Sequence, residues 1–254
     1  MAQHLPAFGL NWAFFLDVDG TLLDIVQHPD DVQCGPGLID TLAALHCIAP
    51  VALISGRPIA MLDRLFAPLQ LPAAGQHGAE SRLSNGQVSR QDTHAQAFTA
   101  IRPALEQFAR QHTGVLLEDK GLTLSLHYRM APALEGEAQA LMSHLLRQLG
   151  DDFVLMAGNK VFEIRPRGRD KGQAIATFMQ TAPFSGHTPV FVGDDVTDED
   201  GFRIVNWMGG YAIKVGEGAT LARGRLEDAG EVLDWLRHYV QWHALQTGAC
   251  QTPS

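Results

Sequence analysis

The sequence contains little that would suit an oxidising compartment or a membrane. Its 254 residues include 3 cysteines (Cys34, Cys47 and Cys250), an odd and scattered set without a CxxC pair. This usage predicts reduced thiols rather than a disulfide framework, as in a cytoplasmic protein. The longest early apolar run, residues 12–16, is far too short to span a bilayer. We therefore expect neither a signal peptide nor a membrane partner.

Positive charge is also scarce. The chain has 19 Lys and Arg against 28 Asp and Glu, a formal net charge of −9 at pH 7. A protein this acidic is poorly suited to binding nucleic acid or an anionic membrane surface. It can bind an anion only locally, through a metal or a few placed cations. The hydrophobic content of 46% is ordinary for a folded protein and excludes disorder as the main state.

Short apolar runs alternate with helical patterns over most of the chain. The runs are typical of strands buried on both faces, at residues 12–16, 51–54, 189–192 and 211–215. Helical patterns separate them, at residues 37–45, 58–69, 171–180 and 231–245. This alternation predicts an α/β fold with a doubly wound parallel-sheet, Rossmann-like core.

The middle of the chain has the pattern of an antiparallel sheet. Two pairs of strand-like segments form apparent hairpins, at residues 115–120, 123–130, 153–156 and 160–165. Helical patterns cover residues 98–111 and 132–149. We therefore predict an inserted α+β domain at residues 93–167, which divides the core into residues 1–92 and 168–254.

Acidic residues follow two of the predicted core strands. Asp17 and Asp19 come directly after residues 12–16, and Asp194, Asp195 and Asp198 come after residues 189–192. Residues i and i+2 of an extended chain point the same way, and parallel strands end at one edge of a sheet. Two like charges about 4 Å apart repel by roughly 4 kcal/mol at an effective dielectric of about 20. Such a cluster needs protons or a cation, and oxygen ligands favour Mg²⁺. The alternative is that these acids only form turns and helix caps.

Two further positions are candidates for binding an anion. Ser55 and Gly56 lie between a predicted strand and a predicted helix, where a hydroxyl and free amides can hold an anion. The alternative is a plain N-cap serine. Lys171 opens another predicted helix, where its charge is slightly unfavourable for the helix dipole. This mismatch indicates a lysine paired with phosphate or carboxylate, and the alternative is an ordinary surface lysine.

These residues, in this order, resemble the four motifs of the haloacid dehalogenase-like phosphatase superfamily. The closer resemblance is to the trehalose-6-phosphate phosphatase family, and it extends over about residues 14–202. The signatures that carry it are LISGR at 53–57, GQHGAE at 75–80, EDKG at 118–121, LHYR at 126–129, EIRP at 163–166 and GDDVTDE at 193–199. The resemblance implies that the inserted domain is a mobile cap.

The resemblance also implies roles for the site residues. Asp17 would become an aspartyl-phosphate, and Asp19 would act as general acid and then general base. Ser55 and Lys171 would hold phosphate oxygens. The implied residues of the metal site are Asp17, Asp19 through its carbonyl, Asp194, Asp195 and Asp198. Which of Asp194 and Asp195 binds the metal directly is left open, as is a role for Asp195 and Asp198 in orienting water or Lys171. Other implied substrate contacts in this region are at Val18, Gly56 and Arg57.

Alternation along the strands of the inserted domain separates an apolar face from a charged one. Glu118 and Lys120 share the charged face, and Glu163 and His127 lie on the charged sides of their own strands. The resemblance implies that these side chains bind sugar hydroxyls, whereas the pattern alone equally fits a solvated sheet face. His77 is predicted to be a core or loop residue rather than a metal ligand.

The resemblance thus implies a Mg²⁺-dependent phosphatase that acts on trehalose 6-phosphate. Separately, we expect a monomer. Alternatives are a phosphatase for another sugar phosphate, such as sucrose phosphate or mannosyl-phosphoglycerate, and a phosphomutase. A regulator that binds a sugar phosphate without hydrolysing it is a further alternative. The presence of Asp17, Asp19 and Lys171 argues against a regulator, because a binding protein needs no nucleophile.

Overall fold

The computed structural model describes residues 5–25, 34–35, 37–90, 96–168 and 170–248. The chain divides into two compact units: unit 1 is Met1–Val88 with Asp170–Ser254, and unit 2 is Ser89–Arg169. The domain predicted at residues 93–167 falls within unit 2, and its predicted first boundary lies outside the described residues.

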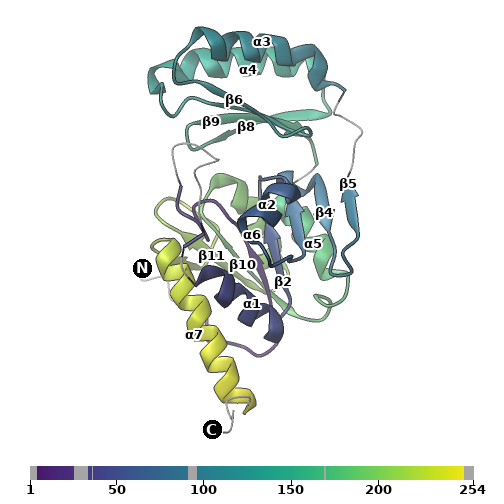
Figure 1. Ribbon diagram of the computed structural model, residues 1–254, viewed down its shortest axis with the longest axis vertical. Helices are drawn as coiled ribbons and strands as arrows, with labels where there is room; N and C mark the ends of the chain where they lie inside the picture. Colours follow the sequence, from purple (N-terminus) through teal and green to yellow (C-terminus); the bar gives the residue numbers. More distant parts are fainter. Residues whose placement is uncertain (1–4, 26–33, 36, 91–95, 169, 249–254) are drawn as a thin grey trace. The chain divides into compact units, whose positions relative to one another are not determined.

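Unit 1 is built on an eight-stranded sheet in the order β12-β11-β10-β1-β2-β3-β4-β5, of which β5 continues into the first residues of unit 2 (Figure 1). All strands from β12 to β3 pair in parallel, and β4 is antiparallel to β3. The strands are β1 (Trp12–Leu16), β2 (Val51–Ile54), β3 (Ala73–Gly75), β4 (Glu80–Arg82), β5 (Val88–Arg90), β10 (Thr188–Gly193), β11 (Tyr211–Val215) and β12 (Gly224–Leu226).

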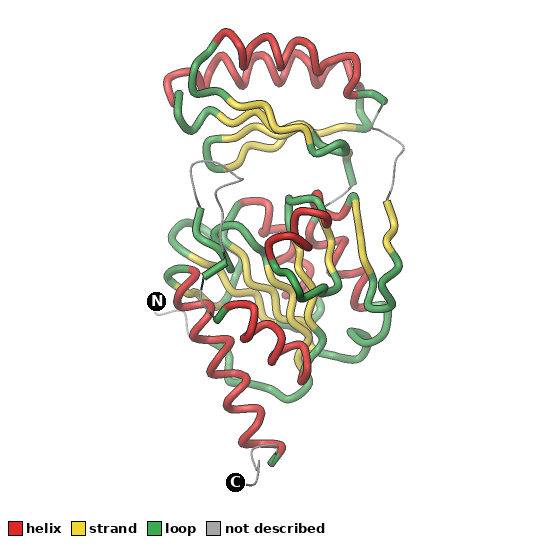
Figure 2. The backbone as a smooth tube through the Cα atoms, viewed as in Figure 1, coloured by secondary structure: helices red, strands yellow, loops and turns green. Residues whose placement is uncertain are grey.

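Helices cover both faces of this sheet (Figures 1 and 2). The strand β1 is therefore buried on both of its faces. Alternate residues belong to two different core clusters: Trp12, Phe14 and Leu16 to the first, and Ala13 and Phe15 to the second. The first cluster includes residues of α1 (Leu38–Ile48), α2 (Ile59–Leu65) and α7 (Ala229–Thr247). The second includes residues of α5 (Lys171–Met179) and α6 (Glu199–Trp207). The predicted doubly wound core is therefore confirmed.

Several details of unit 1 differ from the prediction. The helix predicted over residues 58–69 ends at Leu65, because Pro68 has no N–H for a helical hydrogen bond. The pattern also missed the helix α6 and the strands β3, β4, β5 and β12. These strands are only three residues long, too short for an apolar run or an alternation to be visible.

Unit 2 is a four-stranded antiparallel sheet with two helices on one face (Figure 2). The sheet order is β6-β7-β9-β8. Its elements are α3 (Phe98–Gln111), β6 (Leu116–Asp119), β7 (Leu124–His127), the 3₁₀ turn η4 (Pro132–Leu134), α4 (Glu135–Leu149), β8 (Phe153–Gly158) and β9 (Val161–Pro166). Leu124, Leu126, Phe162 and Ile164 pack in one core with both helices, so the predicted apolar face is confirmed.

Cys34 and Cys47 are free thiols, and Cys250 lies outside the described residues. Within the described ranges, every helix is too short or too polar to cross a bilayer.

Tyr239 of α7 is the packing centre of the core on its face of the sheet. Its fully buried ring stacks on Trp12, with ring centroids 5.5 Å apart, and meets the edge of Phe14 at 4.7 Å. Its hydroxyl donates a hydrogen bond of 3.0 Å to the carbonyl of Gly9.

We predict that Tyr239→Ala lowers the free energy of unfolding by about 3–5 kcal/mol, because it leaves a cavity the size of an aromatic ring. Tyr239→Phe keeps the ring and loses one hydrogen bond, so it should cost about 1 kcal/mol. Urea unfolding followed by tryptophan fluorescence measures both. Equal losses in the two variants would place the stabilisation in the hydroxyl group rather than in the ring.

Candidate active site

The predicted site residues emerge from three neighbouring strands of unit 1. Strand β1 pairs in parallel with β10 and β2, and Leu16 is in register with Val192 and Leu53. All three strands therefore end at the same edge of the sheet. Asp17 follows β1, Ser55 follows β2 and Asp194 follows β10. The sheet topology thus brings together the acidic groups that the sequence separates.

A buried lysine lies between two of these carboxylates. The Nζ of Lys171 donates hydrogen bonds of 2.6 Å to Asp17 Oδ1 and 2.6 Å to Asp198 Oδ1. Its side chain is 3% exposed, while those of Asp17 and Asp198 are 5% and 0% exposed. Burial alone lowers the pKa of Lys171, but the two carboxylates outweigh burial and hold this pKa well above its ordinary value. Lys171 is therefore a permanent positive charge at this site.

Carboxylate charge still exceeds the charge of Lys171. Oxygen atoms of Asp17, Asp194 and Asp198 all lie within 4.8 Å of one another. Burial and the charge of Asp198 raise the pKa of Asp17 well above its usual range. Burial and the same neighbour raise the pKa of Asp194 to about 7. Three oxygen ligands with excess negative charge fit a hard cation such as Mg²⁺.

The three carboxylates differ in how many of their oxygens are already engaged. Asp198 Oδ2 accepts hydrogen bonds of 3.0 Å from the backbone N–H groups of Asp194 and Asp195, and its Oδ1 accepts from Lys171. Among the described residues, no donor engages the carboxylate of Asp194. A side chain at Gly20, whose φ is +81°, would collide with this carboxylate. Asp194 is therefore better suited to metal binding, and Asp198 to holding Lys171 and the loop.

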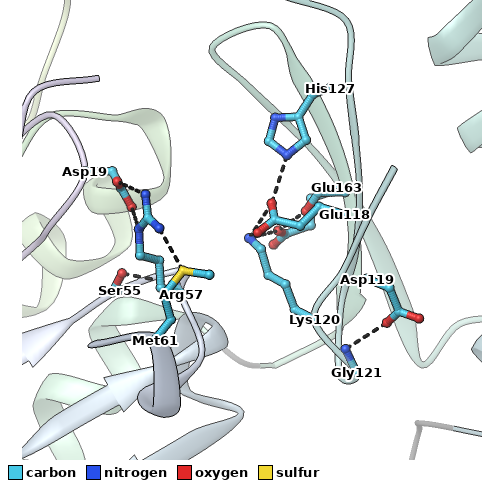
Figure 3. Close-up of polar contacts among 11 residues, drawn as sticks. Asp19, Ser55, Arg57, Met61, Glu118, Asp119, Lys120, Gly121, His127 and Glu163 are labelled. Carbon is cyan, nitrogen blue, oxygen red and sulfur yellow. Dashed lines mark hydrogen bonds and ion pairs between the residues drawn. The ribbon is translucent and has the colours of Figure 1, made fainter. Parts of the chain in front are cut away.

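Two of the predicted acidic residues lie apart from this group. Asp195 contributes its backbone N–H to Asp198, and its carboxylate is not part of the cluster. The carboxylate of Asp19 is bound by Arg57, whose Nε and Nη2 donate two parallel hydrogen bonds of 2.7 Å each (Figure 3). Only the backbone carbonyl of Asp19 is left for the predicted role in metal binding.

The loop after β2 also carries predicted site residues. Ser55 is 1% exposed, and its Oγ accepts a hydrogen bond of 3.1 Å from the N–H of Arg57. Gly56 lies between them, and Val18 is fully buried beside Asp17. Thr21 was not predicted as a site residue, although it belongs to the Asp17 motif. Its hydroxyl donates a hydrogen bond of 3.3 Å to Asp17 Oδ2.

In unit 2, the predicted charged face forms a connected cluster (Figure 3). Lys120 Nζ lies 3.2 Å from Glu163 Oε2 and 3.7 Å from Glu118 Oε2. His127 Nε2 lies 2.9 Å from Glu118 Oε2. Burial acts to raise the pKa of Glu118, but the hydrogen bond to His127 and the charge of Lys120 outweigh it and lower this pKa. Glu118 is therefore an ionised acceptor at neutral pH.

Ser125 is a further member of this cluster that was not predicted as a site residue. Its hydroxyl donates a hydrogen bond of 2.6 Å to Glu163 Oε2. Alternation along β7 places Ser125 and His127 on the same face, so the sequence contained the signal for including it.

Several solved structures share this fold. A chain described as a trehalose-6-phosphate phosphatase related protein matches with a TM-score of 0.80 at 26% identity, over 92% of this chain and 99% of its own. The C-terminal domain of the Candida albicans trehalose-6-phosphate phosphatase matches with a TM-score of 0.83 at 23% identity, over 91% and 92%. A phosphatase of the haloalkanoate superfamily from Bacteroides thetaiotaomicron has the same fold, with a TM-score of 0.61 at 17% identity over 92% and 98%. The fold is thus that of the haloacid dehalogenase-like phosphatases.

Sequence comparison narrows this class to one family. The sequence model of the trehalose-phosphatase family matches residues 15–224. The trehalose-6-phosphate phosphatase of Escherichia coli K12 is 42% identical over 91% of this chain and 87% of its own length. A probable trehalose-phosphate phosphatase of Sinorhizobium fredii is 42% identical over 81% and 78%. The chain belongs to the trehalose-phosphatase family and is a phosphoric monoester hydrolase.

The crowding of carboxylates predicts how stability depends on pH in the absence of metal. Because the folded state raises the pKa of Asp194 to about 7, the folded chain binds more protons than the unfolded chain between about pH 4 and 7. The contribution of Asp194 to stability therefore falls as the pH rises through this window.

We predict that Asp194→Asn, which cannot ionise, raises the melting temperature at pH 8 in EDTA by about 3–6 °C. At pH 5, Asp194 is protonated in the folded chain but mostly ionised in the unfolded chain, so the difference in melting temperature should shrink to about a third of its value at pH 8. Differential scanning fluorimetry across this pH range checks both. A destabilised Asp194→Asn at pH 8 would show that the carboxylate is favourably paired there.

Proposed function

We propose that the chain hydrolyses trehalose 6-phosphate to trehalose and phosphate, with Mg²⁺ as cofactor and a phosphorylated Asp17 as intermediate. The observation that carries this proposal is the setting of Asp17. Its carboxylate is buried at the end of β1, bonded to Lys171, and surrounded by the oxygens of Asp194 and Asp198. The activity named for the relatives at 42% identity supports the substrate.

In the first step, an Asp17 oxygen attacks phosphorus in line with the ester bond. The phosphorus–oxygen bond to the sugar breaks, and a proton from Asp19 neutralises the departing alkoxide, which is too basic to leave alone. For this step Arg57 must release the Asp19 carboxyl group, which it binds in the structure. Lys171 and the hydroxyl of Ser55 hold the remaining phosphate oxygens and stabilise charge in the transition state. Thr21 keeps the Asp17 carboxylate oriented.

In the second step, a water molecule attacks the phosphorus of the aspartyl-phosphate. Asp19, now a carboxylate, takes the proton from this water, and the bond between phosphorus and Asp17 breaks. Phosphate leaves, and Asp17 is ready for another turnover. Asp198 holds Lys171 in place throughout, because both of its oxygens are engaged in hydrogen bonds.

The residues proposed to hold Mg²⁺ are Asp17, Asp194 and the carbonyl of Asp19, near Asp198. When bound, the ion offsets the negative charge of the nucleophile and of the phosphate together. Two observations support this assignment. Carboxylate oxygens of Asp17, Asp194 and Asp198 lie within 4.8 Å of one another, and the pKa values of Asp17 and Asp194 are raised.

The polar cluster of unit 2 is proposed to bind the hydroxyl groups of the sugar. Glu118, Lys120 and Glu163 offer both acceptors and donors, as a polyhydroxylated ligand requires. The contacts of Ser125 and His127 to Glu163 and Glu118 hold two of these side chains in fixed positions.

For the nucleophile, we predict that Asp17→Asn lowers phosphate release from trehalose 6-phosphate at least about a thousand-fold, because an amide does not attack phosphorus. Asp40→Asn, at an exposed position of α1, is the matched control and should retain full activity. EDTA should abolish the wild-type activity, and added Mg²⁺ should restore it. Phosphate release by a folded Asp17→Asn variant near the wild-type rate rules out this nucleophile.

For the sugar site, we predict that Glu118→Ala and Lys120→Ala each lower kcat/KM for trehalose 6-phosphate about 10- to 100-fold. The same variants should leave hydrolysis of p-nitrophenyl phosphate nearly unchanged, since that ester has no sugar hydroxyls. Asp119→Ala is the matched control, because Asp119 lies between them but pairs with Arg102 at 2.6 Å instead. Equal losses on both substrates would refute a role in recognising the sugar.

Wild-type activity on a panel of sugar phosphates tests the substrate itself. Sucrose phosphate, mannosyl-phosphoglycerate and glucose 6-phosphate should be hydrolysed much more slowly than trehalose 6-phosphate. Transfer of phosphate to a second sugar, without release of free phosphate, would identify a phosphomutase instead.

A further inference from the structure

The signature at residues 75–80 has no role in the chemistry above, yet it lies directly against the phosphate-binding loop. Strand β3 pairs in parallel with β2, so the 3₁₀ turn η2 (Gln76–Gly78) follows β3 at the edge of the sheet where Ser55 follows β2. The N–H of Gln76 donates a hydrogen bond of 3.1 Å to the carbonyl of Arg57. The N–H of His77 donates one of 3.0 Å to the carbonyl of Ser55.

Glu80 of β4 completes the contact between the turn and the loop. Its Oε2 accepts a hydrogen bond of 3.0 Å from the N–H of Ile59, where α2 begins. Its Oε1 accepts one of 2.8 Å from Nε2 of Gln76. Glu80 is 6% exposed, so this carboxylate is buried between the turn and the end of the loop.

Two residues of the turn have a strained, left-handed backbone conformation, and contacts of their side chains explain why neither is glycine. Gln76 and His77 are consecutive non-glycine residues with φ of +48° and +56°, a region that side chains disfavour. Glycine would adopt this conformation more easily. However, a glycine at position 76 would lack the side-chain amide that donates to Glu80, and a glycine at position 77 would lack the ring that lies over Gly56. A Cβ at Gly56 would be 2.8 Å from His77 Nε2.

The same turn lies close to the helix that carries Lys171. A Cβ at Gly78 would be 3.5 Å from the carbonyl of Asp170 and 3.5 Å from the Cβ of Ala174. The turn therefore lies beside both elements proposed to present phosphate-binding groups, the Ser55 loop and the start of α5.

We propose that Glu80 is a positioning residue: through the left-handed turn at Gln76 and His77, it fixes the Ser55–Gly56–Arg57 loop in the conformation that binds phosphate. This inference rests on the proposed function, in which Ser55 holds a phosphate oxygen. A loop that binds phosphate must keep its donors in place before the ligand arrives, because even a displacement of about 1 Å costs as much as 100-fold in rate.

The test measures competitive inhibition by inorganic phosphate, together with KM for trehalose 6-phosphate and for p-nitrophenyl phosphate. Glu80→Ala removes both hydrogen bonds to the loop and turn, and it should raise all three constants by a common factor of about 10 or more. Glu80→Gln should restore most of the affinity. Its oxygen can accept from Ile59, and the amide of Gln76 can rotate to accept from its nitrogen.

Asp63→Ala is the matched control for a general loss of stability. Asp63 pairs at 2.7 Å with Arg82, which lies on the same strand as Glu80 and donates its other hydrogen bonds to the carbonyl of Leu71. This variant should lower the melting temperature while leaving the three constants within about two-fold of wild type. If Asp63→Ala weakens phosphate binding as much as Glu80→Ala does, or if Glu80→Ala leaves phosphate binding unchanged, the proposal is wrong.

A second pair of variants decides the matter if Glu80→Ala does not fold. Gly56→Ala should weaken phosphate inhibition, because its methyl group meets the His77 ring. Adding His77→Ala should recover part of that loss by making room. No loss in Gly56→Ala, or no recovery in the double variant, contradicts the proposal.

Ser55→Ala separates this inference from the proposed function. If Ser55→Ala leaves phosphate inhibition unchanged, the loop does not bind phosphate and the proposed site itself is wrong. If Ser55→Ala weakens the inhibition while Glu80→Ala does not, only the positioning role of Glu80 is refuted.

Discussion

The active-site edge of unit 1 depends on one buried ion pair network, in which Lys171 binds Asp17 and Asp198 at 2.6 Å each. Burying charges is costly unless they are paired and hydrogen-bonded. Lys171 meets this condition for two carboxylates, while the backbone N–H groups of Asp194 and Asp195 occupy the remaining oxygen of Asp198. Without this lysine, the three acids would need more protons or another cation to lie within 4.8 Å of one another. Burial, together with the repulsion that remains, raises the pKa values of Asp17 and Asp194.

Backbone shape is as important to this site as charge. Gly20 adopts a φ of +81° and leaves no room for a side chain against Asp194. The left-handed turn at Gln76 and His77 bonds the carbonyls of Ser55 and Arg57. Each is a conformation or a close approach that ordinary residues resist, and each lies beside a proposed phosphate or metal contact. In the proposed mechanism, residues of unit 1 bind the phosphate group, and the polar cluster of unit 2 binds the sugar hydroxyls.

Much of the fold could be predicted from local patterns. The strand at Trp12–Leu16 and the helix at Phe98–Gln111 lie where the apolar periodicity placed them. Alternation along β7 and β9 correctly assigned Leu126 and Ile164 to the core of unit 2. Strands as short as β3 and β12 escaped detection, because three residues establish no period and such strands form only through pairing with neighbours. The helix α2 was predicted too long, because its apolar pattern continued past the point where Pro68 prevents helix formation.

The sequence by itself determined the chemical inventory: an acidic motif after β1, a second after β10, and the order of motifs that identifies the family. It also determined that the acids emerge at one edge, because parallel strands leave no other choice. Only the tertiary structure decided which partner each of these carboxylates binds. It turned Asp19 to Arg57, bonded both oxygens of Asp198, and left the carboxylate of Asp194 facing Asp17. Those pairings join residues up to 154 positions apart, and spacing along the chain carries no information about which of several nearby carboxylates a given cation will meet.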